Sequence, residues 1–305
     1  MKRIIYSLYI DIPEDRLDWQ PPYTGDDIPK TKRTKLLFAE HADWLKSMHE
    51  KYAKTIGVEY KLFTADSAYY NYEKLFLENY PQITGYNIVN FYKIYLLSYL
   101  ADLGYDEILY LDFDAVPVTD ECFFDFWNVT KRGVAILTNK RDVDLSLDKL
   151  LMDKKKRERY GRRITNRSPT AKYWNARAML MDHPNPVDAS EVYNTGIIGI
   201  SSKDIQKLDY FGDFAGTLKF MDELKYEEPN MYPEHIRELF GWDNETLFAY
   251  KMAINNVKKQ WLDDRWHYFF DKHLIIPKSS KIVHTINKNF DYVKEWCEKY
   301  EKTHL

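Results

Sequence analysis

The chain has 305 residues, of which 45% are hydrophobic and 30% are charged, and its formal net charge is -3 at pH 7. This length and composition fit one large α/β enzyme with an ample core, and the charge excludes recruitment of nucleic acid or acidic membrane by bulk electrostatics. The two cysteines, Cys122 and Cys297, exclude a disulfide framework and fit a reducing compartment.

The first part of the chain alternates between strand and helix patterns. Residues 4–10 form a short apolar run that predicts a buried first strand and not a signal peptide. No later run approaches the roughly 20 apolar residues of a membrane helix, so we expect a cytoplasmic protein without a transmembrane segment. A helix is expected over 35–56 and a second strand over 57–63. A further helix is expected over 87–103, with four side chains along one face: Ile88, Phe91, Tyr95 and Tyr99.

In EILYLDFDAVPV a short apolar run of four residues leads into two acidic residues, Asp112 and Asp114, and another strand is expected over 134–138. Alternating strands and helices predict a mostly parallel sheet, and ligands bind where the strands of such a sheet end. In an extended segment both carboxylates share one face and Phe113 takes the other. Two close carboxylates are costly without a cation, and their oxygens select Mg²⁺ or Mn²⁺. A pair of solvated acids at a strand end is the structural alternative.

The middle of the chain changes character. Residues 139–190 are polar, include a basic run at 154–163 and show no strong periodic pattern, which indicates a functional lid or a disordered segment. The chain then resumes with the strand VYNTGIIGIS, followed by helices and loops as far as residue 260. A late strand at 281–285 and a C-terminal amphipathic helix complete the expected elements.

His284 lies inside this late strand, with Lys288 four residues further on. A lone histidine in a strand is more often a core or surface residue than a ligand. Here a neutral imidazole would supply a third ligand beside Asp112 and Asp114, and a nitrogen ligand shifts the preference from Mg²⁺ toward Mn²⁺. Lys288 would then meet phosphate oxygens as a point charge.

Two further segments carry polar groups suited to a sugar. In YNTG, Asn194 offers a donor and an acceptor to hydroxyl groups, and Gly196 permits close approach of a ligand or of another backbone. A β-turn or bulge is the structural alternative there. In GWDNE, Asp243 and Asn244 would place a carboxylate and an amide beside the sugar, or one of them would cap the helix that follows.

The order of these segments resembles the retaining glycosyltransferases of family 8, the group that includes glycogenin and bacterial lipopolysaccharide galactosyltransferases. The matching segments run in family order over residues 1–290: NFYKIYLL with Lys93, the D-x-D strand YLDFDAVPV, YNTGIIGI, WDNETLFAYKMAIN, LDDRWHYF and VHTINKNF. The resemblance implies a glycosyltransferase-A fold, with a mostly parallel central sheet flanked by helices. It also implies Mn²⁺ or Mg²⁺, a nucleotide-sugar donor linked to uridine diphosphate, and a glycan or other hydroxyl acceptor.

Carried over to this sequence, the resemblance implies roles for individual residues. Asp112 would contact the ribose and the metal, and Asp114 and His284 would complete the metal ligands. Lys288 would hold diphosphate oxygens, and Lys93 would contact the donor sugar or the diphosphate. The residues expected to line the sugar are Asn194, Asp243 and Asn244.

The resemblance also implies an organisation for the whole chain. Residues 1–305 would form one domain, with 1–138 as the nucleotide-sugar-binding half and 139–305 as the acceptor-side half with a helical C-terminus. The insert 139–190 would lie over the acceptor, which it would contact through Tyr160, Tyr173 and Trp174. Family members retain the anomeric configuration by front-face attack with an oxocarbenium-like transition state, in which the metal and the lysines would stabilise the departing diphosphate.

The sequence departs from the family pattern at three points. Asn244 stands where the family has Gln, so its amide is one methylene shorter. Lys93 stands in place of Arg, which loses the bidentate grip on phosphate. His284 and Lys288 are four residues apart, where the family spaces them more widely with a Gly between.

Three other functions remain open on the sequence. A haloacid dehalogenase-like phosphatase also has an apolar run before D-x-D, and Asp263 with Asp264 would hold its Mg²⁺, although that motif normally follows the first strand of the fold. A catalytically silent homologue would bind glycan or nucleotide, which the shorter amide of Asn244 would allow. An inverting transferase would use Glu245 or Asp243 as its base.

Overall fold

The computed structural model describes most of the chain in two compact units. The described residues are 1–17, 22, 27–83, 85–128, 132–138, 168–187, 193–228, 230, 232, 234–238, 240–270 and 275–304, with the backbone alone at 168–174, 235–236 and 301–304. The first unit comprises Met1–Ala135, Gly196–Ser202 and Gln260–Leu305, and the second comprises Ile136–Thr195 and Lys203–Lys259.

A six-stranded sheet has the strand order β2-β1-β3-β6-β5-β7. Its strands are β1 (Arg3–Tyr9), β2 (Glu59–Thr64), β3 (Glu107–Leu111), β5 (Val134–Thr138), β6 (Tyr193–Ser201) and β7 (Lys259–Trp261). Strand β1 pairs in parallel with both β2 and β3, and β3 pairs antiparallel with β6. Strands β1 and β3 are almost entirely buried, as strands covered on both faces are. The predicted α/β class with a mostly parallel central sheet is confirmed.

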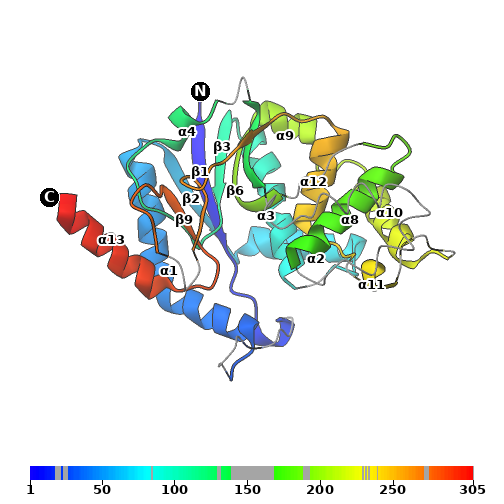
Figure 1. The fold of residues 1–305 in the computed structure, drawn as a ribbon, viewed down its shortest axis with the longest axis horizontal. Coiled ribbons are helices and arrows are strands. Elements are labelled where there is room, and N and C mark those ends of the chain that lie inside the picture. The colour runs from blue at the N-terminus through cyan, green and yellow to red at the C-terminus, as the bar shows by residue number, and fades with distance from the viewer. Residues whose placement is uncertain are drawn as a thin grey trace. The chain divides into compact units, whose positions relative to one another are not determined.

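Helices cover both faces of β1, β2 and β3. The helices of the first unit are α1 (Lys30–Thr55), α2 (Ser67–Asn79), α3 (Tyr86–Asp102), α4 (Phe123–Phe126) and α13 (Phe290–His304), with the short 3-10 helix η1 (Glu14–Arg16). The Tyr6 hydroxyl donates to the carbonyl of Lys93 on α3 (2.6 Å), whereas His49 of α1 stacks on Tyr60 of β2. Tyr60 lies beside Ile5, which points away from Tyr6 because side chains alternate along a strand. Figure 1 accordingly shows α1 and α3 on opposite sides of these strands.

The helix predicted over 87–103 forms as α3, but its surroundings differ from those expected. Ile88 and Phe91 are buried, whereas Tyr95 is 41% exposed and Tyr99 is 38% exposed. Several positions that the helical pattern did not single out, Tyr92 and Leu96 among them, are buried instead. The buried side of α3 is therefore broader than one apolar stripe, and the two tyrosines lie outside it.

A second, three-stranded sheet also lies in the first unit. It consists of β4 (Ala115–Pro117), β9 (Ile282–Thr285) and β8 (Tyr268–Phe270), in the order β4-β9-β8. Antiparallel pairing with β4 sets His284 opposite Ala115, and parallel pairing with β8 sets it opposite Phe269. A hydrophobic cluster binds this sheet to α1 and α13, with Leu45, Phe113, Val283 and Phe290 among its members. The late strand predicted at 281–285 is confirmed, and its pairing brings His284 to the segment that follows β3.

The second unit is mainly helical where it is described. Its helices are α8 (Ser168–Asp182), α9 (Ser202–Leu208), α10 (Phe214–Tyr226), α11 (Glu234–Arg237) and α12 (Asn244–Ile254). Helix α8 packs against α12 and α10. No helix among the described residues is both long enough and apolar enough to cross a membrane.

Helix α8 corrects the expectation of a lid or a disordered segment over 139–190. The stretch from Asn175 to Leu180 is buried, so this part of the segment belongs to the core of the second unit. Two of its buried side chains are polar, which hides the apolar pattern of a helix in the sequence. The Asn175 amide donates to the carbonyl of Gly241 (2.7 Å), and the Arg177 guanidinium donates to that of Val187 (3.2 Å).

The remaining expectations for this segment concern residues or side chains that the structure does not describe. Residues 139–167 and 188–192, with the basic run 154–163 and Tyr160, lie outside the described residues. Tyr173 and Trp174 belong to α8, but their side chains also lie outside what is described.

Candidate metal centre

The two carboxylates of the D-x-D motif meet across a turn, not along an extended strand as predicted. Strand β3 ends at Leu111, and the amide of Ala115 donates to the carbonyl of Asp112 (2.8 Å) to close the turn. Phe113 is buried at its tip, where its ring stacks on Tyr9 at 5.1 Å between centroids. The turn, like the extended segment expected from the sequence, places the Phe113 ring away from the two carboxylates. Only the backbone conformation differs from the prediction.

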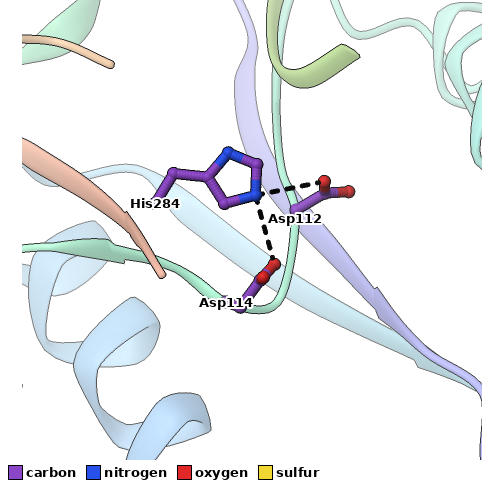
Figure 2. Close-up of side chains that lie close together, drawn as sticks. All are labelled: Asp112, Asp114 and His284. Atoms are coloured by element: carbon purple, nitrogen blue, oxygen red, sulfur yellow. Dashed lines mark ion pairs between the residues drawn. The ribbon is translucent and has the colours of Figure 1, made fainter. Parts of the chain in front are cut away.

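His284 completes a group of three ligand-type side chains. Its Nε2 atom lies 3.7 Å from Oδ2 of Asp112 and 3.6 Å from Oδ1 of Asp114. Figure 2 shows the imidazole pointing between the two carboxylates, with both ion pairs leaving the same nitrogen. Across the described part of the chain, these three residues form the only group of histidine, cysteine or carboxylate side chains placed to share a cation. The three predicted metal ligands are therefore together.

In each carboxylate one oxygen contacts lysine or tyrosine side chains and the other lies near His284. Oδ1 of Asp112 accepts from the Tyr110 hydroxyl (2.5 Å) and lies 3.5 Å from Nζ of Lys93. Oδ2 of Asp114 pairs with Nζ of Lys288. Consequently one oxygen of each acid is anchored by these partners, and the other faces His284.

The three ligand atoms lie within 4.8 Å of one another. Ligand atoms about 2.1 Å from a six-coordinate cation lie about 3.0 Å apart when adjacent and about 4.2 Å apart when opposite. The distances of 3.6 and 3.7 Å to the histidine nitrogen match neither value, so the three atoms would share such a cation after small shifts. Two carboxylate oxygens and one imidazole nitrogen suit Mn²⁺ better than Mg²⁺, which prefers oxygen alone.

A second histidine, which the sequence analysis did not single out, holds the first one in place. Nε2 of His267 lies 2.9 Å from Nδ1 of His284, and both rings are buried. If Nδ1 of His284 carries the proton and donates to His267, Nε2 keeps its lone pair for a cation, as in histidine ligands with an oriented outer partner. Burial, and then the neighbouring His284, hold the pKa of His267 well below its usual value, so this ring is neutral and can accept that hydrogen bond.

The charges around the turn keep Asp114 ionised. Burial by itself would raise the pKa of this carboxyl, but the nearby Lys288 and His284 outweigh burial and hold the pKa well below its usual value. Asp114 is thus a carboxylate across the ordinary pH range, which is the form that binds a cation. The pKa of Tyr110 is raised by burial and by the charge of Asp112, so its hydroxyl stays a hydrogen-bond donor.

Lys288 reaches the site by a tight turn in spite of its short spacing from His284. Its backbone takes a left-handed conformation, with φ 56°, and its amide donates to the carbonyl of Thr285 (3.1 Å). Such a conformation is costly for a residue with a side chain and marks a position that the surroundings enforce. The turn folds the chain back, so that Nζ of Lys288 meets Asp114.

A cavity of about 240 Å³ opens beside the carboxylates. The last residue of β1 contributes Tyr9 and the segment after it Asp11, α1 contributes Phe38, and the first turns of α3 contribute Tyr86 and Asn90. Lys93, Lys288 and all three ligand-type residues also line it. The cavity therefore joins the candidate metal centre to strand ends and to a helix N-terminus, which are features that favour a bound phosphate.

The residues expected to line the sugar belong to the second unit, where most of them support the fold. Asp243 caps α12 by accepting from the amide (2.9 Å) and the hydroxyl (2.6 Å) of Thr246. The buried amide of Asn244 donates to the Thr195 hydroxyl (2.8 Å), and the buried carboxylate of Glu245 accepts from the Thr195 amide (3.1 Å). The capping alternative is thus realised at Asp243, and both carboxylates considered as an inverting base hold hydrogen bonds of the scaffold.

The remaining predicted site residues lie on β6. Asn194 is partly exposed and precedes the buried Thr195. The carbonyl of Gly196 accepts from the amide of Asp112 (2.7 Å), so the close approach expected at this glycine is made by the backbone of the D-x-D turn.

The acidic pair considered for a phosphatase does not join the cluster. Asp263 accepts from the backbone and the guanidinium of Arg265, with the shortest of these bonds at 2.7 Å. Within the described residues, neither Asp263 nor Asp264 belongs to a group placed to hold a cation.

Comparison with known proteins gives similar solved structures only. No protein-family model matches the sequence, and no curated protein matches it. The chain is similar to a glycosyltransferase involved in glycosylation of the major capsid of PBCV-1, at 10% identity and a TM-score of 0.45 over 98% of this chain and 100% of the other. It is similar to the galactosyltransferase LgtC in complex with donor and acceptor sugar analogues, at 11% identity and a TM-score of 0.45 over 98% of this chain and 94% of the other. It is also similar to mouse xyloside xylosyltransferase 1, at 11% identity and a TM-score of 0.41 over 94% of this chain and 98% of the other.

All three solved structures are glycosyltransferases, the class that the ordered motifs of this sequence resemble. Their identities and TM-scores describe a distant similarity. The chemistry of the site therefore rests on this chain's own residues.

Proposed function

We propose that the protein is a metal-dependent glycosyltransferase of the glycosyltransferase-A type. It would move a sugar from a nucleotide diphosphate, uridine diphosphate by the family resemblance, to a hydroxyl group of a glycan or other acceptor. The same resemblance favours retention of the anomeric configuration and Mn²⁺ as the cation.

The observation that carries this proposal is the convergence of Asp112, Asp114 and His284 on one point at the wall of a cavity. These residues would hold the cation, whose chemistry is to neutralise a diphosphate and so make it a better leaving group. Lys288 and Lys93 stand on either side of the carboxylates, where each can turn from carboxylate to phosphate oxygen. Two lysines beside a cation supply fixed positive charge where negative charge grows in the transition state.

The nucleoside would lie against the end of β1. Tyr9 and Asp11 line the cavity there, and the N-terminal turns of α3 direct their positive dipole end toward it. Asn194, Asp243 and Asn244 are proposed to serve the sugar, a part of the proposal that the YNTG and WDNE motifs support.

The test is a nucleotide-release assay with Mn²⁺ across a panel of UDP- and GDP-sugars, together with direct Mn²⁺ titration by electron paramagnetic resonance. We compare wild type, Asp114→Ala and Asp102→Ala, which removes an exposed acid at the end of α3 in the same unit. Asp114→Ala should abolish hydrolysis of the preferred donor and weaken Mn²⁺ binding by roughly tenfold or more. Asp102→Ala should match wild type. Absence of both nucleotide binding and turnover in wild type would refute the proposal.

A second candidate is a catalytically silent protein that binds nucleotide sugar. The observation that favours it is the Asn244 amide, which is buried and already donates to Thr195. Mn²⁺-dependent nucleotide binding without release from any donor, alone or with glycan acceptors, would select this candidate.

A further inference from the structure

A groove between α2 and α3 is lined by five tyrosines among its fourteen residues. Its cavity of about 500 Å³ has a size typical of small-molecule and glycan sites. Tyr95 and Tyr99 form one wall from α3, and Asn71 and Asn79 stand on α2. The same helix α3 also lines the cavity at the metal centre, but through Val89, Asn90 and Lys93, so no residue is shared between the two.

The rings of this groove form a continuous aromatic layer. Tyr72 of α2 contacts both Tyr92 (4.7 Å between centroids) and Tyr95 (5.0 Å). Tyr92 and Tyr95 are nearly parallel, at 15°. Because Tyr95 and Tyr99 lie one helical turn apart and are 41% and 38% exposed, each offers part of a ring to solvent. Helix packing alone would not require aromatic side chains at these two exposed positions.

The polar groups of the groove are numerous and balanced in charge. Tyrosine hydroxyls and asparagine amides both donate and accept hydrogen bonds. The hydroxyl of Tyr72 is buried and has no hydrogen-bond partner among the described residues, which is unusual because buried polar groups are normally paired. Lys61 and Asp66 are the charged residues that line the groove, and they carry opposite charges.

From this combination we infer that the α2–α3 groove is a binding site for a neutral saccharide, separate from the metal centre. The apolar C–H face of a pyranose ring stacks on an aromatic ring, while its hydroxyls need donors and acceptors at the ring's edge. Tyrosine supplies both with little loss of conformational entropy. A charged ligand would find no net charge here, and a purely apolar partner would bury the hydroxyls and amides without partners. The inference does not depend on transferase activity.

The experiment is native affinity electrophoresis in gels that contain soluble glycogen, mannan, xylan or hydroxyethyl cellulose. The test variant is Tyr95→Ala/Tyr99→Ala, which truncates two exposed rings and leaves the buried ones in place. Tyr226→Ala is the matched control, because Tyr226 is 61% exposed on α10 in the second unit. Circular dichroism confirms that each variant is folded.

We expect at least one polysaccharide to retard wild type, and the double variant to bind it roughly tenfold more weakly or worse. Tyr226→Ala should be retarded like wild type. Asp114→Ala should be as well, which keeps this result independent of the metal-centre proposal. The inference is overturned if no polysaccharide retards wild type, or if the double variant keeps full affinity. It is also overturned if sedimentation shows a wild-type dimer that dissociates in the double variant, because the groove would then be a self-association surface.

Discussion

The imidazole of His284 can offer a lone pair to a cation only if its other nitrogen carries the proton. Nε2 of His267 lies 2.9 Å from that nitrogen, in a position closed to solvent, where it can accept the hydrogen bond of such a proton. Loss of this partner leaves the three ligands present but frees the ring to rotate or to change tautomer. His267 is therefore a positioning residue, and its effect should appear in metal affinity.

We expect His267→Phe, which fills the space without accepting a hydrogen bond, to weaken Mn²⁺ binding about 10- to 100-fold. His267→Gln keeps an acceptor and should recover part of the affinity. His41→Phe changes a buried histidine of α1 outside the cluster and should have no effect on Mn²⁺ binding. Titration of Mn²⁺ by electron paramagnetic resonance measures all three. Equal affinities in wild type and His267→Phe would refute the positioning role.

Asp243 allows a structural role and a sugar-binding role to be separated. Because its side chain caps α12, Asp243→Ala should lower the free energy of unfolding by about 1 kcal/mol, whereas Asp243→Ser should keep most of the cap. Urea denaturation gives both values. If Asp243→Ser keeps its stability but loses turnover, the carboxylate also serves the sugar, and if it keeps both, Asp243 is a cap alone.

At the scale of single residues, the sequence indicates the three candidate metal ligands but not His267, which contacts one of them. Asp112 and Asp114 are visible as D-x-D after an apolar strand, and His284 as a polar residue in a late strand. His267 carries no comparable signal, because its partner is seventeen positions away and meets it only through the pairing of β8 with β9. The turn at Asp112 is hidden for a related reason, since alternation predicts an extended segment until Ala115 is known to pair with His284.

Strand β6 shows how tightly the central sheet is packed. A Cβ atom on Gly199 would lie 2.8 Å from the ring of Phe123 and 3.1 Å from Cβ of Ala135, closer than side-chain atoms normally approach. The glycine therefore lets an aromatic ring press against the strand.

Gly199→Ala should consequently lower the free energy of unfolding by about 1–3 kcal/mol, the usual cost of overpacking. Gly241→Ala is the matched control, because a Cβ atom there meets nothing within 4 Å. It should change stability by less than about 0.5 kcal/mol. Urea denaturation of the two variants tests the packing argument, which fails if both are equally stable.

The apolar pattern locates β1 well, because apolar residues dominate its buried positions. Helix α1 begins at Lys30, five residues before its predicted start, and half of its buried residues are polar. The sequence pattern did not predict helix α8, because the polar residues Asn175 and Arg177 occupy buried positions and interrupt the apolar period. Both are buried through hydrogen bonds to backbone carbonyls elsewhere in the chain. Short strands such as β4 form only by pairing with a partner far along the chain.

At the scale of the whole molecule, the first unit is discontinuous in sequence. It takes Gly196–Ser202 from the middle of the chain and Gln260–Leu305 from its end. The first of these segments supplies the part of β6 that pairs with β3, and the second supplies His284 and the α13 residues of the hydrophobic cluster.

We therefore expect a fragment of residues 1–138 to lack a cooperative thermal transition by circular dichroism and to bind no Mn²⁺, although it contains both aspartates. Strand β3 would have an unpaired edge, and the buried face around Phe113 would be exposed. The full chain, measured in parallel, should melt cooperatively. A sharp transition in the fragment would show that the N-terminal segment folds by itself.

At the candidate metal centre two carboxylates are paired with two lysines, and these pairs affect how a divalent cation would bind. Asp112 with Lys93 and Asp114 with Lys288 sum to zero charge, so a bare divalent ion would give these four side chains a net positive charge. An ion that arrives already complexed with a nucleotide diphosphate brings its own counter-charge, and the lysines can turn to the phosphates. Ion and nucleotide should then strengthen each other's binding by the same factor. Occupancy would follow the supply of nucleotide sugar more closely than the level of free metal.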